Sequence, residues 1–263
     1  MNWFMNQSPV FQGLLATLFT YSVTALGAAL VFFFKSVNRK ILDAMMGFGS
    51  GVMLAASYWS LLEPSIERAK NLGMCVWLVT SLGFFCGGAV IIAADRLLSK
   101  SSYLETANGT GYKRSILLFS AVTLHNIPEG LAVGVAFGSV AKGCEGATLM
   151  GALLLALGIG IQNFPEGTCI SLPLRRDGIS VGKAFFWGQL SGIVEPIAGV
   201  FGVVLVMAVT NILPFLLAFS AGAMIAVCAS ELIPESAHSN KNLATFGLLI
   251  GFIIMMSLDV TLG

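Results

Sequence analysis

The 263-residue sequence contains few charged side chains. Only 10% of its residues are Asp, Glu, Lys or Arg, whereas 56% are hydrophobic. A soluble globular domain carries about 25% charged residues, so this composition argues against a soluble domain and favours a polytopic membrane protein. The formal net charge of +1 offers no basis for binding nucleic acid, and the bilayer is the expected environment.

Cysteine patterns and nucleotide-binding loops are also missing. The five cysteines are scattered and form no CxxC pair, which excludes a disulfide framework and a zinc finger. The absence of GxxxxGK[ST] excludes an ATPase built from this chain. The N-terminal residues M-N-W-F-M-N-Q-S-P have no basic region of the signal-peptide kind, so we expect the first apolar helix to be retained.

Long apolar runs dominate the chain. A helix needs about 20 such residues to span the hydrocarbon core, and the runs predict an all-α membrane protein with one polytopic domain over residues 1–263. The predicted helices cover residues 9–34, 41–63, 73–97, 115–141, 146–173, 181–209, 212–235 and 243–262. A polar segment at 98–114 is the longest predicted linker.

The basic residues predict the orientation of these eight helices. Eleven Lys and Arg residues flank the connections after the first, third, fifth and seventh helices, and three lie on the other side. Basic connections stay in the cytoplasm, so we expect both termini to be extracytoplasmic, in a plasma or bacterial inner membrane, with 98–114 inside.

Two copies of one polar motif interrupt the fourth and fifth helices. H-N-I-P-E-G begins at His125, and Q-N-F-P-E-G begins at Gln162. In each copy the first residue and the glutamate are four positions apart and share a helix face. The polar side chains of the two copies are those of His125, Asn126, Glu129, Gln162, Asn163 and Glu166.

The prolines of the two motifs have a predicted consequence for the backbone. Pro128 and Pro165 cannot donate to the carbonyls of Leu124 and Ile161, so each helix should bend there. Freed carbonyls at membrane depth are tolerated where they line a cavity or coordinate an ion.

Glu195, also followed by proline, adds a third carboxylate in the sixth helix. An ionisable group at the bilayer centre costs at least about 2.5 kcal/mol, and three ionised carboxylates would repel one another. A divalent cation removes that cost, and His with carboxylates suits Zn²⁺ and other first-row ions. Hydrogen bonding within a helical bundle is the structural alternative.

Other polar or soft residues are weaker candidates. Met53, in the second helix, is either a soft metal ligand or packing. Glu231, Glu235 and His238 lie near the cytoplasmic end of the seventh helix, where they form either an exit path for the ion or a solvated helix end.

Two internal similarities suggest inverted repeats. The fourth and fifth helices share the motif and run in opposite directions. F-G-S-G-V-M-L-A-A-S from Phe48 resembles F-S-A-G-A-M-I-A-V-C from Phe219, again in antiparallel helices. Inverted repeats with a site at their interface are typical of transporters.

At H-N-I-P-E-G and Q-N-F-P-E-G the sequence resembles the ZIP (Zrt/Irt-like) metal-transporter family, most closely its GufA-like branch, over essentially the whole chain. The resemblance implies a carrier that moves divalent metal, chiefly zinc, toward the cytoplasm, with an elevator-type motion and a homodimeric assembly. It also implies a mid-membrane site between the fourth and fifth helices that can hold two ions.

Carried over residue by residue, the resemblance implies a primary and a second metal position. The primary position would use His125, Glu129, Gln162 and Glu166, with Met53 as a helix-two ligand. The second would use Asn126, Asn163 and Glu195, bridged by Glu129 and Glu166.

Two features of the sequence depart from the family pattern. Some members carry Asp where this chain has Asn163, so a second metal should bind more weakly here. The loop at 98–114 lacks the histidines found in many members.

Two other functions stay open on the sequence, an intramembrane metalloenzyme and a metal-selective channel. The chain has no H-E-x-x-H motif and no nucleophile beside a base, so we expect it not to be an enzyme. The ligand types also accept Cd²⁺, Fe²⁺, Mn²⁺, Co²⁺ and Ni²⁺ beside Zn²⁺.

Overall fold

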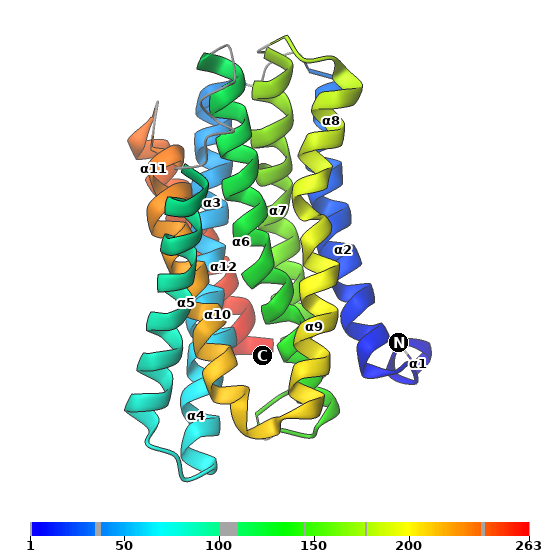
Figure 1. Cartoon of the computed structure of the whole chain (residues 1–263), viewed down its shortest axis with the longest axis vertical. Helices are drawn as coiled ribbons and strands as arrows, with labels where there is room; N and C mark the ends of the chain where they lie inside the picture. Colours follow the sequence, from blue (N-terminus) through cyan, green and yellow to red (C-terminus); the bar gives the residue numbers. More distant parts are fainter. Residues whose placement is uncertain are drawn as a thin grey trace.

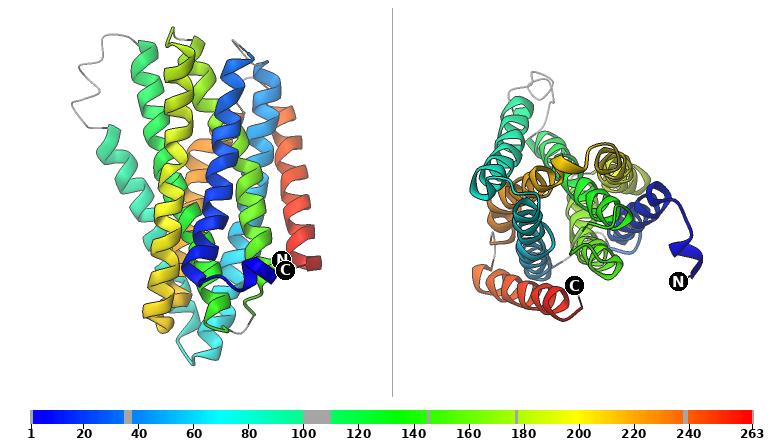
Figure 2. Two further views of the ribbon diagram at one scale, coloured as in Figure 1. Left: turned by 90° about the vertical axis from the view of Figure 1, so that its right-hand side faces the viewer. Right: turned by 90° about the horizontal axis from the view of Figure 1, so that it is seen from below.

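The protein is a bundle of long helices that stand roughly along one axis (Figure 1 and Figure 2). The computed structural model describes residues 2–34, 38–99, 110–144, 146–176, 178–237 and 240–262. Over these residues the secondary structure is helical and contains no strand. The all-α prediction is therefore confirmed.

The α-helices and their shorter extensions follow one another closely along the chain. The α-helices are α1 Asn2–Met5, α2 Pro9–Ala29, α3 Arg39–Ala56, α4 Glu63–Asn71, α5 Val76–Ser99, α6 Thr110–Ala141, α7 Leu149–Arg176, α8 Val181–Leu190, α9 Val194–Ala208, α10 Leu213–Val227, α11 Ile233–Ser236 and α12 Lys241–Leu262. Short 3-10 turns are η1 Leu30–Phe32, η4 Ser191–Ile193 and η5 Thr210–Ile212, and π-helical segments are η2 Ser57–Leu62 and η6 Cys228–Leu232.

Seven segments of the described chain are long and apolar enough to cross a membrane. They are Pro9–Phe32, Arg39–Asn71, Val76–Ala94, Leu149–Arg175, Val181–Ala208, Leu213–Leu232 and Lys241–Thr261. The remaining long helix, α6, includes many residues whose side chains the structure does not describe. Part of the predicted linker, 100–109, also lies outside the described residues, and α6 begins within the rest of it, at Thr110.

Glycines bring the helices into pairs. A Cβ atom on Gly167 of α7 would lie 2.0 Å from the carbonyl oxygen of Thr24 in α2, and one on Gly51 of α3 would lie 2.0 Å from that of Leu248 in α12. Only a residue without a side chain permits backbones to approach this closely in a membrane bundle. Contacts of this kind pair α2 with α7, α6 with α9, α3 with α12 and α5 with α10.

The helix containing Phe48 and the helix containing Phe219 correspond in structure as well as in sequence. The π-helical segment η2 starts at Ser57 and η6 starts at Cys228, which are equivalent positions in the two similar stretches. The two helices are antiparallel, since Ser65, just after η2, donates to the carbonyl oxygen of Pro214 at the start of α10 (2.6 Å). This supports the predicted inverted repeat.

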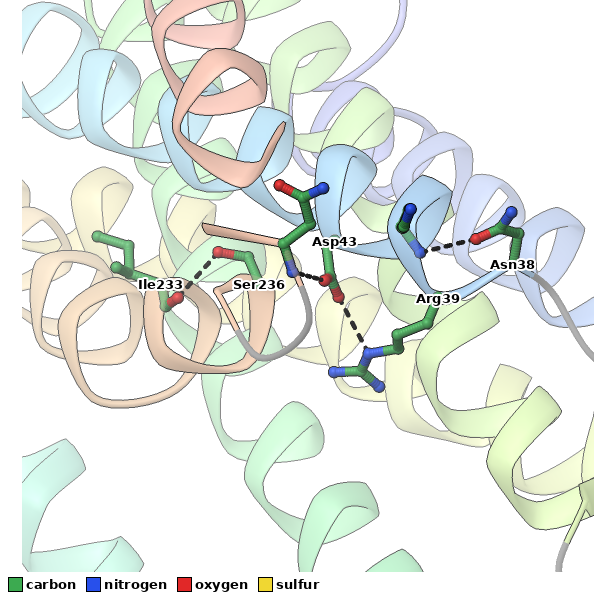
Figure 3. A network of polar contacts seen from close by, with 7 residues as sticks. Asn38, Arg39, Asp43, Ile233 and Ser236 are labelled. Atoms are coloured by element: carbon green, nitrogen blue, oxygen red, sulfur yellow. Dashed lines mark hydrogen bonds and ion pairs between the residues drawn. The ribbon is translucent and has the colours of Figure 1, made fainter. Parts of the chain in front are cut away.

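A buried carboxylate fixes one end of the bundle, opposite α4. Asp43 Oδ1 accepts a hydrogen bond from Arg39 Nε (3.0 Å), and Asp43 Oδ2 accepts one from the backbone N–H of Asn240 (2.9 Å; Figure 3). Because Asp43 is fully buried, these contacts satisfy its charge and hold the start of α3 against the turn before α12.

Candidate metal site

The two motifs meet between α6 and α7, near the middle of both helices. Gln162 Nε2 donates a short hydrogen bond to Glu129 Oε1, and both side chains are almost completely buried. The helices continue through Pro128 and Pro165. The spacing within each motif predicted that its polar side chains share one face of the helix. Glu129 and Gln162, one from each motif, do lie together.

Glu195 of α9 joins the same region from a third helix. Its Oε1 and Oε2 both accept hydrogen bonds from Asn163 Nδ2, at 2.9 and 3.0 Å. The carboxylate of Glu166 interacts electrostatically with that of Glu195. Both glutamates are buried, Glu195 fully and Glu166 to 3% exposure.

Asn126 extends this cluster from α6 toward the break between α8 and α9. Its Nδ2 donates to the backbone carbonyl of Ser191, 3.0 Å away, in the 3-10 turn η4. That turn interrupts the segment Val181–Ala208 just before Glu195, so Asn126 contacts the break that precedes Glu195.

Three buried amide oxygens in this cluster have no hydrogen-bond partner among the described residues. They are Asn126 Oδ1, Gln162 Oε1 and Asn163 Oδ1. A buried acceptor left unsatisfied costs about 1–3 kcal/mol. Three such acceptors close together, one in the first motif and two in the second, are unusual for a folded protein. Together with the buried carboxylates they form a cluster rich in oxygen ligands, of the kind that suits a cation.

Two of the predicted ligands, His125 and Met53, require separate statements. The backbone of His125 lies in α6, one residue before Asn126, but its side chain is outside the described residues. Met53 is fully buried in α3, one turn from Gly49, which packs against Gln162. Across the described side chains, no three His, Cys, Asp or Glu residues come together as a metal site. The amide ligands stay a prediction.

The candidate exit residues are only partly described. Glu231 is half-buried in the π-helical segment η6, toward the end of the bundle where Asp43 lies. Glu235 belongs to α11, but its side chain is not among those described, and His238 lies outside the described residues. The exit path stays a prediction.

The structure adds residues that the sequence analysis did not select. Asn163 Nδ2 also donates to the carbonyl of Thr20 (3.3 Å), and Thr24 Oγ1 donates to Glu195 Oε1 (3.4 Å). The signal was present in α2, because Thr17, Thr20 and Thr24 recur every three or four residues and all are fully buried.

A thiol is a second addition. Cys228, fully buried at the start of η6, lies within electrostatic range of the Glu166 carboxylate, and its Sγ donates to the carbonyl of Ser50 (3.6 Å). The sequence already aligned Cys228 with Ser57, as the last residues of the two similar stretches. Its proximity to Glu166 could not be predicted, because it depends on how α10 packs against α3.

The comparisons with known proteins settle the family. The sequence model of the ZIP zinc transporter family matches residues 100–259, more than half of the chain. The chain belongs to this family. Zinc transporter ZIP11 of Xenopus tropicalis is 41% identical, over 97% of this chain and 98% of its own length.

Bacterial relatives are similar over most of their length as well. Zinc transporter GufA of Myxococcus xanthus is 36% identical, covering 95% of this chain and 99% of its own length. Zinc transporter ZIPB of Bordetella bronchiseptica is 32% identical over 92% of this chain and 79% of its own length. The resemblance noted in the two motifs is thereby confirmed at the level of the family.

Proposed function

We propose that the protein is a zinc carrier that moves the ion across the membrane toward the cytoplasm. The observation that carries this proposal is the set of unpartnered amide oxygens beside Glu129, Glu166 and Glu195, buried between membrane-length helices. A dehydrated divalent cation would accept these oxygens as ligands and offset the carboxylate charge. Family membership and the names of the relatives support zinc as the cargo.

Each residue has a definite role in this proposal. Glu129 and Glu166 supply the negative charge of the primary position, and the oxygen of Gln162 and the imidazole of His125 complete it. The Asn163 amide stabilises the Glu195 carboxylate by donating to both of its oxygens. A second ion would have to displace these hydrogen bonds, so one ion binds tightly and a second binds weakly.

The packing above the site favours a carrier over a channel. Fully buried apolar side chains, including Val133 of α6 and Ile159 of α7, lie between Glu129 or Gln162 and the end of the bundle at α4. A continuous pore would need water along this route. An ion therefore needs helices to rearrange before it reaches the site from that end, as alternating access requires.

The direction of transport and the assembly are further parts of the proposal. The excess of basic residues at one end supports cytoplasmic placement of that end, with both termini outside. A homodimer is proposed from the family resemblance.

The decisive experiment is zinc uptake into liposomes that hold the purified protein and a trapped zinc-sensitive dye. We expect Glu129→Ala and Glu166→Ala each to abolish saturable uptake, because each removes a charged ligand and leaves the cation's desolvation uncompensated. Ser171→Ala is the matched control, since Ser171 is fully buried in α7 but lies outside the site. It should retain uptake.

The outcomes separate the alternatives. Flux that survives both glutamate substitutions contradicts the site, whereas uptake that stays proportional to zinc at all concentrations favours a channel. Cd²⁺ and Mn²⁺ run in parallel measure selectivity. Correct membrane folding of each variant is checked by monodisperse gel filtration.

A further inference from the structure

The thiol of Cys228 approaches the candidate metal site from a helix that contains neither motif. Cys228 begins the π-helical segment η6 at the end of α10, and its side chain is fully buried. The Glu166 carboxylate, on α7, lies within electrostatic range of the thiol. Packing between separate helices therefore places a sulfur atom near one of the proposed ligands.

Helix α3 brings the thiol and the second motif to the same level of the bundle. Cys228 Sγ donates to the backbone carbonyl of Ser50, 3.6 Å away. The preceding residue, Gly49, lies against α7, since a Cβ atom there would be 3.4 Å from the Cβ of Gln162. Consecutive residues of α3 thus contact Cys228 and Gln162.

A buried oxygen of Gln162 has no protein partner at this level. Gln162 is 1% exposed, and its Oε1 atom has no hydrogen-bond partner among the described residues. Its Nε2 atom donates to Glu129. Because the two branches of a planar amide diverge, Oε1 is turned away from that carboxylate oxygen and is the atom left for a ligand. A buried acceptor of this kind indicates a cation beside it.

The contact between Cys228 and Ser50 leaves the sulfur available to an ion. An S–H···O contact is weak. Ser50 lies inside α3, where the N–H four residues later satisfies its carbonyl in any case. Loss of the thiol hydrogen therefore leaves no buried acceptor unsatisfied.

The equivalent residue of the repeat directs its side chain differently. Ser57 begins η2 as Cys228 begins η6. The Ser57 hydroxyl donates to the carbonyl of Met53, four residues earlier in its own helix (2.7 Å). Cys228 donates instead to a neighbouring helix. The direction of the thiol is therefore a feature of Cys228 and not of the π-helical segment in general.

We propose that Cys228 is a further ligand of the ion at the primary position, and that its sulfur makes the site prefer soft ions. This inference rests on the proposed function. Within the described residues no three His, Cys, Asp or Glu side chains converge, so Cys228 and Glu166 share the ion with the Gln162 amide oxygen. The thiol releases its proton to water as the metal–sulfur bond forms.

Sulfur adds a ligand type that the two motifs lack. The motifs offer carboxylate, amide and imidazole groups, which accept most first-row divalent ions. A thiolate favours Zn²⁺ and Cd²⁺, whereas Mn²⁺ prefers oxygen ligands. Cys228 would therefore discriminate among ions that the motif residues accept alike.

The test is a titration of the purified full-length protein with Cd²⁺, followed by the ultraviolet charge-transfer band of a cadmium–sulfur bond. We expect the wild-type band to saturate at one Cd²⁺ per chain. Cys228→Ser should lose the band and bind Cd²⁺ about tenfold more weakly, because a hydroxyl replaces a soft ligand. Glu166→Ala should also lose the band at the same Cd²⁺ concentration, because the carboxylate holds the same ion.

Cys169→Ser and Cys144→Ser are the matched controls. Both cysteines are buried; Cys169 lies three residues after Glu166 in α7, and Cys144 lies in the connection between α6 and α7. Each control should keep the band. A band that persists in Cys228→Ser, or that disappears in Cys169→Ser, overturns the proposal.

Cadmium NMR of the wild type needs no variant. A sulfur ligand moves the cadmium resonance strongly downfield from the range of sites that contain only oxygen and nitrogen. A resonance within that range overturns the proposal even if Cys228→Ser does not fold.

Uptake into liposomes separates this inference from the transport proposal. Cys228→Ser should raise the KM for Cd²⁺ about tenfold and that for Mn²⁺ less than about twofold, since only the soft ion loses a favoured ligand. Equal changes for the two ions overturn the role in selectivity. If the wild type carries no metal but its cadmium–sulfur band depends on Cys228, the ligand assignment holds and only the transport proposal fails.

Discussion

Asn163 is the single residue that most constrains the number of ions in the proposed site. Its amide donates to both oxygens of Glu195 and to the carbonyl of Thr20. An aspartate at this position could make none of these donations, and its charge would face two other buried carboxylates. A cation or a proton would then have to compensate it.

We therefore expect Asn163→Asp to raise tightly bound zinc from one to two ions per chain, measured by elemental analysis after dialysis against buffered zinc. Thr24→Val is the control, since it removes only the 3.4 Å hydroxyl contact to Glu195 and adds no charge. It should leave one ion bound. Two ions in the wild type would contradict the role given to the Asn163 amide.

At the scale of helices, the site depends on how closely α2 and α7 approach. Gly167 follows Glu166 directly, and a Cβ there would meet the Thr24 carbonyl oxygen at 2.0 Å. Backbone atoms cannot move aside as a flexible side chain does, so the two helices would have to separate. The contact between Asn163 and Thr20 lies one turn away and would lengthen with them.

Gly167→Ala should consequently lower the free energy of unfolding by about 1–3 kcal/mol and weaken zinc binding as well. Gly182→Ala is the matched control in α8, where a Cβ meets nothing within 4 Å. It should be neutral or stabilise by up to about 1 kcal/mol. The melting temperatures of the two variants in detergent are monitored by gel filtration. Equal melting temperatures would contradict the close-packing argument.

At the scale of the whole molecule, the orientation in the membrane sets the direction of transport. Cys75, in the turn between α4 and α5, is exposed at the end that should be extracytoplasmic. Ser180, before α8, is exposed at the opposite end. The two positions therefore report on opposite sides of the membrane.

In intact cells, a membrane-impermeant maleimide should label Cys75 and should not label a Ser180→Cys variant that also carries Cys75→Ser. After the membrane is opened, that variant should react. The Cys75→Ser protein alone measures the background from the other cysteines. Labelling of Ser180→Cys in sealed cells would reverse the predicted topology.

Much of this architecture was accessible from the amino-acid order because it depends on local patterns. Apolar runs of membrane length predicted the helices, and the four-residue spacing of Gln162 and Glu166 predicted a shared face. The family followed from the two motifs, whose residue types and order are specific. The repeat between the stretches that begin at Phe48 and Phe219 was also visible as sequence similarity.

The contacts between helices could not be obtained this way, because they join residues far apart in the chain. That Asn163 donates to Glu195, that Thr24 supports it, and that Asp259 borders a cavity with Glu63 depend on which glycines bring which helices together. The sequence alone determined the membrane helices and the chemistry available at their centre, since both follow from side-chain type and helical periodicity. Only the packing of the helices decided which polar groups satisfy one another and which are left for a cation.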